Sequence, residues 1–316
     1  MGTIIPMRYI RRILENLVVV WAVASLAFFG LRLGRVDPLA SLTAQGLATR
    51  AQAVEMRRAL GLDRPLLDQY AEYFRGVLRG DLGRSIFSGQ DVAGMIAEAA
   101  AYTVPLAVLA WGLSVAFGLA LGTVASRRGG QSGGNRISRM ASAALAVGAA
   151  TPVAWSGLIL LWAAVPLFTA PLPDPLREGL RLLLPAAALA LTVGSSIGRA
   201  AETSIRESRG ELFQLAMRAH GFPRGVRADW RMLRAAIAPV LALAGMEAAF
   251  LLGGTMITEV VFARPGLGRM LVDAVLRGDF PVVQALLALA ALGYILFGMI
   301  ADFSAAILDP RVGEAS

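Results

Sequence analysis

ETSIRESRGELFQLAMRAHGFPRGVRADWRMLRAAIAP, residues Glu202–Pro239, is a polar, arginine-rich stretch set between two apolar segments. Apolar residues recur at helical spacing in its first half, and the second half repeats the pattern with arginines on the opposite face. Between the halves, His220-Gly221-Phe222-Pro223 breaks the helix, because Gly adopts a left-handed cap cheaply and Pro starts a new helix. The stretch therefore predicts two short helices joined by a tight turn, a rigid projection suited to a groove on a partner.

The rest of the chain has the composition of a membrane protein. Its 316 residues are 56% hydrophobic, mean hydropathy is +0.62, and only 16% are charged, against roughly 25% in soluble domains. We expect an all-α polytopic protein with six transmembrane helices, most of them near or above the ~20 residues that cross a bilayer. The six apolar segments are Leu14–Leu33, Tyr102–Ala125, Met140–Leu167, Leu182–Ile197, Ile237–Val261 and Val283–Leu308. The first lacks an evident signal-peptide cleavage site, so we interpret it as a retained span.

The positive charge predicts topology rather than a nucleic-acid partner. All 30 basic residues are arginine and the net charge is +8, which indicates a base-composition bias rather than selection for phosphate binding. Arginines cluster at residues 8–12 before the first span, at 127–139 in the second loop and at 206–234 in the fourth. By the positive-inside rule, the N-terminus, these two loops and the C-terminus are cytoplasmic.

The long loop after the first span is predicted to be extracytoplasmic and partly helical. A helix should start at Asp63-Arg64-Pro65, present an apolar face from Leu66 to Leu78, and end at Gly80. One interpretation is an amphipathic helix packed on the membrane or the spans; another is that it builds the outer face where something docks. The predicted parts are 1–35 (N-terminal segment and first transmembrane helix), 36–98 (extracytoplasmic loop), 99–308 (five-helix core, including a cytoplasmic coupling loop at 203–236) and 309–316 (cytoplasmic tail).

Several chemistries are excluded by missing residue types. A Walker A loop needs a lysine, and the sequence has none. With no cysteine and one histidine there is no His/Cys metal cluster, and neither serine-hydrolase nor zinc-protease motifs occur. We therefore expect no catalytic residue, metal or cofactor on this chain. If it moves a solute with ATP, the energy must come from another polypeptide.

Sequence blocks spread along the chain resemble the permease subunits of the dipeptide/oligopeptide/nickel family of ABC importers. They match the subunit with a long outer loop after its first span, nearly end to end and in the same order. The blocks are Leu60-Gly-Leu-Asp-Arg-Pro65, Gln69-Tyr70, Gly80-Asp-Leu-Gly83-Arg-Ser85, Glu259-Val-Val-Phe-Ala-Arg-Pro-Gly-Leu-Gly268, Asp279-Phe-Pro-Val-Val-Gln284 and Leu308-Asp-Pro-Arg311.

This resemblance implies the type I importer fold in a bacterial inner membrane. A second homologous permease would complete the path, two ATP-binding subunits carrying ATP and magnesium would dock below, and an extracytoplasmic solute-binding protein would deliver the solute. The family's coupling loop maps onto Ala216, Arg218, Ala219, His220, Gly221, Phe222 and Pro223. The chain departs from the family at His220, where lysine is common; we interpret this histidine as a surface residue without catalytic or metal-binding function.

Two acidic residues in the fifth span are candidates for the translocation path. Glu247 lies about half-way along it, and Glu259 lies near its end, where snorkelling is a sufficient explanation. A carboxylate at mid-span is costly unless it faces protein or water. Glu247 could make a helix–helix hydrogen bond or ion pair, or it could contact a cationic solute.

The solute is predicted from the resemblance alone. Peptides come first, and nickel or a metal–chelator complex is the alternative, which the Gly253-Gly254 run and the end of the chain favour. A different class, an ATP-independent secondary carrier or channel, would show internal repeats, and we find no clear repeat between the halves.

Overall fold

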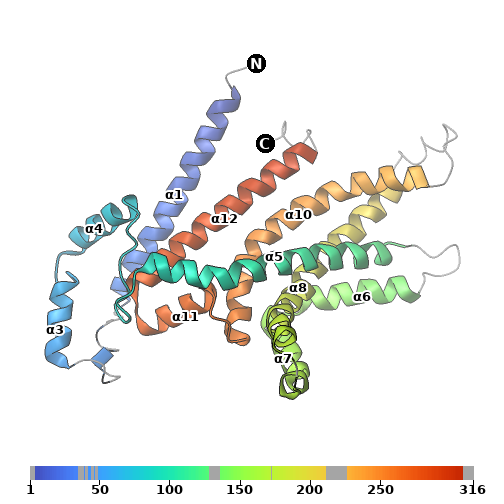
Figure 1. Cartoon of the computed structure of the whole chain (residues 1–316). Coiled ribbons are helices and arrows are strands. Elements are labelled where there is room, and N and C mark those ends of the chain that lie inside the picture. The colour runs from blue at the N-terminus through green and yellow to red at the C-terminus, as the bar shows by residue number, and fades with distance from the viewer. Residues whose placement is uncertain are drawn as a thin grey trace. The chain divides into compact units, whose positions relative to one another are not determined.

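The computed structural model of the chain confirms the all-α prediction (Figure 1). The structure describes residues 4–34, 39, 42, 43, 46, 49–127, 136–171, 173–210 and 226–308. Apart from an isolated β-bridge between Arg84 and Asp91, the regular structure in these ranges is helical. The helices are α1 (Ile4–Leu33), α3 (Arg50–Ala59), α4 (Leu66–Leu78), α5 (Val92–Ala125), α6 (Arg136–Ala150), α7 (Val153–Thr169), α8 (Asp174–Gly210), α10 (Val226–Val261), α11 (Leu267–Arg277) and α12 (Phe280–Leu308).

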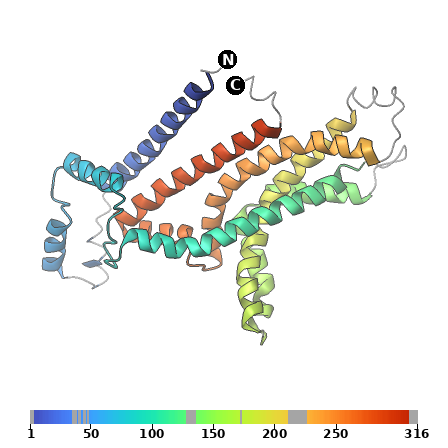
Figure 2. The same cartoon turned by 45° about the horizontal axis from the view of Figure 1, so that its top comes forward.

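Five of the described helices are long and apolar enough to cross a membrane, and a sixth crossing depends on a bent pair. The predicted third span, Met140–Leu167, is not one straight helix, because α6 and α7 meet at an angle of 107° (Figure 2). The bend follows from Pro152, which precedes α7 and has no backbone N–H with which to continue α6. The five single spans are Leu14–Leu33, Val92–Ala125, Asp174–Glu207, Val240–Val261 and Phe280–Ile300.

The chain divides into two compact units. The first contains residues 1–102 and 265–295, and the second contains 103–264 and 296–316. In the first unit, the start of α5, the start of α12 and α11 share an apolar core that includes Val92, Val282 and Leu286. An aromatic cluster joins α1 to α4, with the ring of Phe28 5.3 Å from that of Tyr70.

In the second unit, α8 packs against α6, α7 and α10. It also lies against α5 with almost no side chain between the two backbones. A Cβ atom on Gly118 would lie 2.5 Å from the Gly194 carbonyl oxygen, and one on Gly122 would lie 2.5 Å from that of Gly198. On α5, three residues separate Gly118 from Gly122, and on α8 three residues separate Gly194 from Gly198. This is the small-residue pattern that lets membrane helices approach closely.

The structure confirms some predicted helix ends and adds helices that the sequence analysis did not anticipate. The outer helix α4 begins directly after Pro65, and Gly80 beyond its end has a φ of +79°, as a helix-terminating glycine should. The second short helix predicted after Pro223 and the fifth span form one continuous helix, α10. Two unpredicted helices are α3, whose Thr49 forms a capping box with Gln52, and α11, which ends at Gly278.

Candidate functional site

The predicted coupling residues Ala216, Arg218, Ala219, His220, Gly221, Phe222 and Pro223 lie outside the described residues. The two helices that lead into and out of them, α8 and α10, are described. The described polar cluster closest to the coupling residues in sequence belongs to the last turns of α8, before residue 211.

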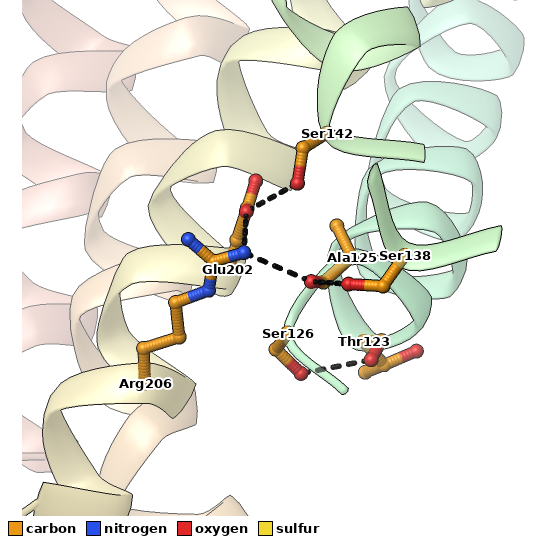
Figure 3. Close-up of polar contacts among 7 residues, drawn as sticks. All are labelled: Thr123, Ala125, Ser126, Ser138, Ser142, Glu202 and Arg206. Carbon is orange, nitrogen blue, oxygen red and sulfur yellow. Dashed lines mark hydrogen bonds and ion pairs between the residues drawn. The ribbon is translucent and has the colours of Figure 1, made fainter. Parts of the chain in front are cut away.

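Glu202 and Arg206 form the centre of that cluster (Figure 3). One turn apart on α8, they are joined by an ion pair of 2.6 Å between Arg206 Nη2 and Glu202 Oε1. Ser142 on α6 donates a hydrogen bond of 2.5 Å to the same carboxylate oxygen. Arg206 Nη2 also donates to the backbone carbonyl of Ala125, at 3.1 Å. We call the Glu202–Arg206 pair with these two contacts the α8 clamp.

The α8 clamp supplies hydrogen bonds that α5 cannot make for itself. Ala125 is the last residue of α5, so its carbonyl has no partner further along the helix. Ser138 Oγ at the start of α6 and Arg206 both donate to that carbonyl, the former at 2.6 Å (Figure 3). The positive guanidinium also lies at the negative end of the helix dipole. The clamp thus ties the end of α5, the first turns of α6 and the last turns of α8 together.

The sequence analysis did not single out this cluster. The Glu202 side chain is only 10% exposed, and its Oε1 atom both pairs with Arg206 and accepts the hydrogen bond from Ser142. The signal was in the sequence, since Glu followed by Arg four residues later on a helix is the favourable order for an ion pair. The tie to Ser142 and Ala125 could not be inferred, because it depends on how three helices pack.

Glu247 lies inside the fifth span on α10, partly buried at the edge of an exposed stripe. The stripe recurs at steps of four and three residues and consists of Met246, Phe250, Gly253, Ile257 and Val260. Glu247 has no hydrogen bond or ion pair to the residues that the structure describes. Trp111 of α5 donates its indole N–H to the carbonyl of Ala244, one turn before Glu247, at 2.9 Å.

Glu259 differs from Glu247 in being completely buried. Its side chain is 0% exposed, and Thr103 Oγ1 donates a hydrogen bond of 2.6 Å to its carboxylate. This contact joins α10 to α5 within the second unit. The geometry gives Glu259 a partner inside its own chain, whereas Glu247 has none among the described residues.

The first unit contains an open cavity of about 640 Å³ between α11, the start of α5 and the loop before α5. One wall is the polar face of α11, where Arg269, Asp273 and Arg277 follow one another at four-residue steps; Arg269 pairs with Asp273 at 3.8 Å. Ser85 Oγ donates to Asp279 at 2.5 Å, and the N–H of Ile86 donates to the other oxygen of that carboxylate at 3.1 Å. This latch fixes the loop to the turn between α11 and α12.

Among the described residues, no group of three or more His, Asp or Glu side chains is arranged to hold a metal ion.

Comparison with known proteins identifies the family. Residues 114–314 match the model of the binding-protein-dependent transport system inner membrane component, and residues 7–107 match the model of the N-terminal part of such membrane components. The chain belongs to this family. It is a multi-pass inner-membrane permease of the ABC importers, in the branch that includes peptide permeases.

Individual relatives cover nearly the whole permease. It is 30% identical over 311 residues to a protein of Sinorhizobium fredii described as a probable peptide ABC transporter permease, covering 96% of this chain and 98% of the relative. It is 33% identical over 310 residues to the glutathione transport system permease protein of Escherichia coli O6:H1, covering 96% and 97%. A solved structure of an amino acid ABC transporter shares the fold, with a TM-score of 0.53, 19% identity, and coverage of 67% of this chain and 92% of that one.

Proposed function

We propose that this permease forms half of the translocation path of an ATP-driven importer of peptides. A second homologous permease forms the other half, two ATP-binding subunits provide the energy, and an extracytoplasmic solute-binding protein delivers the solute. The chain itself is not an enzyme and binds no cofactor, with ATP and magnesium held by its partners. Both termini lie in the cytoplasm in this proposal, which the arginine-rich loops support through the positive-inside rule.

The observation that carries the proposal is similarity over 96% of the chain to permeases whose names specify peptide and glutathione transport. Glutathione is itself a small peptide, so both names indicate the same solute class. Nickel import, the alternative from the sequence, is not favoured by these relatives. A secondary carrier is not favoured either, because the family consists of components of binding-protein-dependent systems.

Uptake by the reconstituted complex tests this function. Proteoliposomes containing both permeases and both ATP-binding subunits, with the binding protein outside and ATP inside, should accumulate a labelled dipeptide or glutathione. They should not accumulate nickel in preference to peptide. Concentration of solute by this chain alone, without ATP-binding subunits, would contradict the proposal and indicate a secondary carrier.

Coupling to ATP hydrolysis is assigned to the predicted turn at residues 216–223. ATP would bring the two ATP-binding subunits together and draw the coupling turns with them, opening the path outward, and hydrolysis would reset it. The α8 clamp supports this assignment, because it anchors the helix that enters the turn to α5 and α6. Replacing Gly221 with valine should leave the complex assembled but reduce transport per ATP hydrolysed. An unchanged ratio in a well-folded Gly221→Val complex would count against the turn.

Glu247 is the path residue that we infer. A carboxylate in the middle of a span cannot face lipid without a large cost, and within the described chain it has no partner. A water-filled path shared with the second permease would solvate it and bring it to the ammonium group of a peptide.

Glu247→Gln should raise the KM for peptides with a free amino terminus more than for N-acetylated ones. Glu55→Gln, on the surface helix α3, is the matched control and should change neither. An equal change for both peptide classes would refute this role.

Glu259, the second candidate from the sequence, remains a prediction as a path residue, although its hydrogen bond from Thr103 is better explained by helix packing.

A further inference from the structure

A small pocket in the first unit lies where two spans end. Its volume is about 220 Å³, and it is bounded by the last turn of α1, by α4, by the Leu82-Gly83 loop and by the start of α12. Ligand pockets for drug-sized molecules measure about 300 to 1,000 Å³, so this one suits a smaller group. Its polar lining is formed by Arg32, Gln69, Glu72, Tyr73, Asp81 and Gln284.

Two hydrogen-bond donors line the pocket, Arg32 and Gln284. Arg32 is held in place by its Nε, which donates to Gln69 at 2.9 Å, by its Nη1, which donates to the Phe28 carbonyl at 3.5 Å, and by the Phe28 ring, 3.6 Å from the centre of the guanidinium. It forms no ion pair with a described residue. Gln284 is only 3% exposed, and its Nε2 is buried without a hydrogen-bond partner in the described chain. A buried donor of this kind destabilises the folded protein unless an acceptor is supplied.

The same pocket also contains acceptors. Glu72 and Asp81 line it with exposed carboxylates. Glu72 also forms an ion pair with Arg64 at 3.0 Å, and Asp81 Oδ1 accepts a hydrogen bond from the N–H of Gly83 at 2.8 Å. Burial raises the pKa of Tyr73, while the charge of nearby Arg32 lowers it to a lesser extent, so the phenol stays neutral. The lining thus combines a guanidinium without an ion pair and a buried amide donor with two carboxylates in one small space, which is complementary to a zwitterion.

The position of the pocket indicates that a zwitterion bound there would come from the membrane. The first span ends at Leu33, next to Arg32, and the last begins at Phe280, next to Pro281 and four residues before Gln284. Ends of spans lie at the headgroup layer, where aromatic residues also gather. The cluster of Phe28, Phe29, Tyr70, Tyr73 and Phe74 beside this pocket is of that kind.

We propose that this pocket binds the phosphoethanolamine headgroup of a phosphatidylethanolamine molecule from the adjacent leaflet. Arg32 and Gln284 donate to the phosphate oxygens, and Glu72 and Asp81 accept from the primary ammonium. Phosphatidylcholine has the same two charges, but its ammonium carries no N–H to donate. Phosphatidylglycerol has the phosphate and lacks the ammonium. The lipid would fasten α1 and α4 to the start of α12.

Lipid retention by the intact importer complex tests the proposal without any transport measurement. The complex is exchanged into nanodiscs of equal parts phosphatidylethanolamine, phosphatidylcholine and phosphatidylglycerol, extracted in mild detergent, and analysed by native mass spectrometry. Phosphatidylethanolamine should remain bound about tenfold more often than either other lipid, equivalent to about 1.4 kcal/mol. Phosphoethanolamine added in solution should compete with it. If phosphoethanolamine binds the delipidated complex as tightly as phosphatidylethanolamine does, the natural ligand of the pocket is the free zwitterion and not a membrane lipid.

Matched variants separate the two halves of the pocket. Gln284→Glu replaces a donor by a carboxylate of the same shape and should lower retention of phosphatidylethanolamine about tenfold. Asp81→Asn keeps the acceptor for Gly83 and should reduce only the preference for phosphatidylethanolamine over phosphatidylcholine. Gln90→Glu adds the same charge beside the larger cavity, outside this pocket, and should retain the lipid as the unmodified chain does.

Equal retention of the three lipids by the unmodified complex would overturn the proposal. So would equal retention of phosphatidylethanolamine by the Gln284→Glu and Gln90→Glu complexes, provided that both elute as intact assemblies. Neither result depends on whether the importer moves peptides, so failure here leaves the proposed function untouched.

Discussion

Replacing Gly122 with alanine should separate α5 from α8. The added Cβ would lie 2.5 Å from the Gly198 carbonyl oxygen and 2.9 Å from the Cβ of Ala201, whereas ordinary contact begins at 3.4 Å. The backbones must therefore retreat by about 0.9 Å, the difference between 3.4 and 2.5 Å. Neither obstacle can rotate away, because one is backbone and the other is a Cβ fixed to it.

The cost can be placed within a narrow range. Overpacking a well-packed interior costs typically about 1–3 kcal/mol, and an obstacle made of backbone places Gly122→Ala in the upper half, about 2–3 kcal/mol. For a unit of this size, about 2–4 °C is lost per kcal/mol, so the midpoint of thermal unfolding should fall by about 4–12 °C. The measurement is a thermal melt of the purified complex followed by tryptophan fluorescence.

Gly112→Ala is the matched control on the same helix. A Cβ there has nothing within 4 Å, and alanine favours a helix over glycine by about 1 kcal/mol, so its melting midpoint should stay or rise. If Gly122→Ala melts at or above the temperature of Gly112→Ala, the close contact between α5 and α8 does not exist as described, and the reasoning fails.

Three further results are expected. Glu202→Gln should remove the negative charge of the α8 clamp and lower the free energy of unfolding by about 1–2 kcal/mol, a modest loss because Arg206 is 45% exposed and its charge is partly screened. The same variant should lower transport per ATP more than it lowers ATPase activity, with both measured side by side in proteoliposomes. Asp279→Ala should leave Ser85 and the Ile86 N–H without their acceptor and increase protease cleavage in residues 85–90, whereas Asp273→Ala, exposed on α11, should not. Gly278→Ala should cost about 1 kcal/mol in a thermal melt because its φ is +76°, while alanine at Gly179, which has no neighbour within 4 Å, should not destabilise.

The helices themselves were largely predictable from the sequence. The first span was placed at Leu14–Leu33, as the structure has it, because a continuous apolar run needs no knowledge of its neighbours. The outer helix α4 was also predicted, since Pro65 and Gly80 mark its ends. The break at Pro152 was missed: proline is tolerated inside membrane helices, as Pro105 within α5 shows, so its presence does not by itself predict a bend.

The polar contacts were less predictable, because they join residues far apart in sequence. In the sequence, Glu247 and Glu259 are both acidic residues of one span. In the structure, Glu259 accepts a hydrogen bond from Thr103, 156 residues earlier, whereas Glu247 has no partner in the described chain. The difference arises because Glu259 contacts Thr103 of α5, whereas Glu247 lies beside the exposed stripe of α10. Periodicity gives the face of a helix, but not the identity of what packs against it.

The contact between α5 and α8 restricts where the transport motion can occur. Sliding of one helix past the other would drive the Gly118 and Gly122 backbone into that of Gly194 and Gly198, and the α8 clamp fixes their ends as well. A pull on α8 through the coupling turn must therefore move α5, α6 and α8 together. The exposed stripe of α10 has no such restraint within the described chain. If the proposed second permease packs against this stripe, we expect the sliding surface of the transport motion to lie there, with Glu247 at its edge.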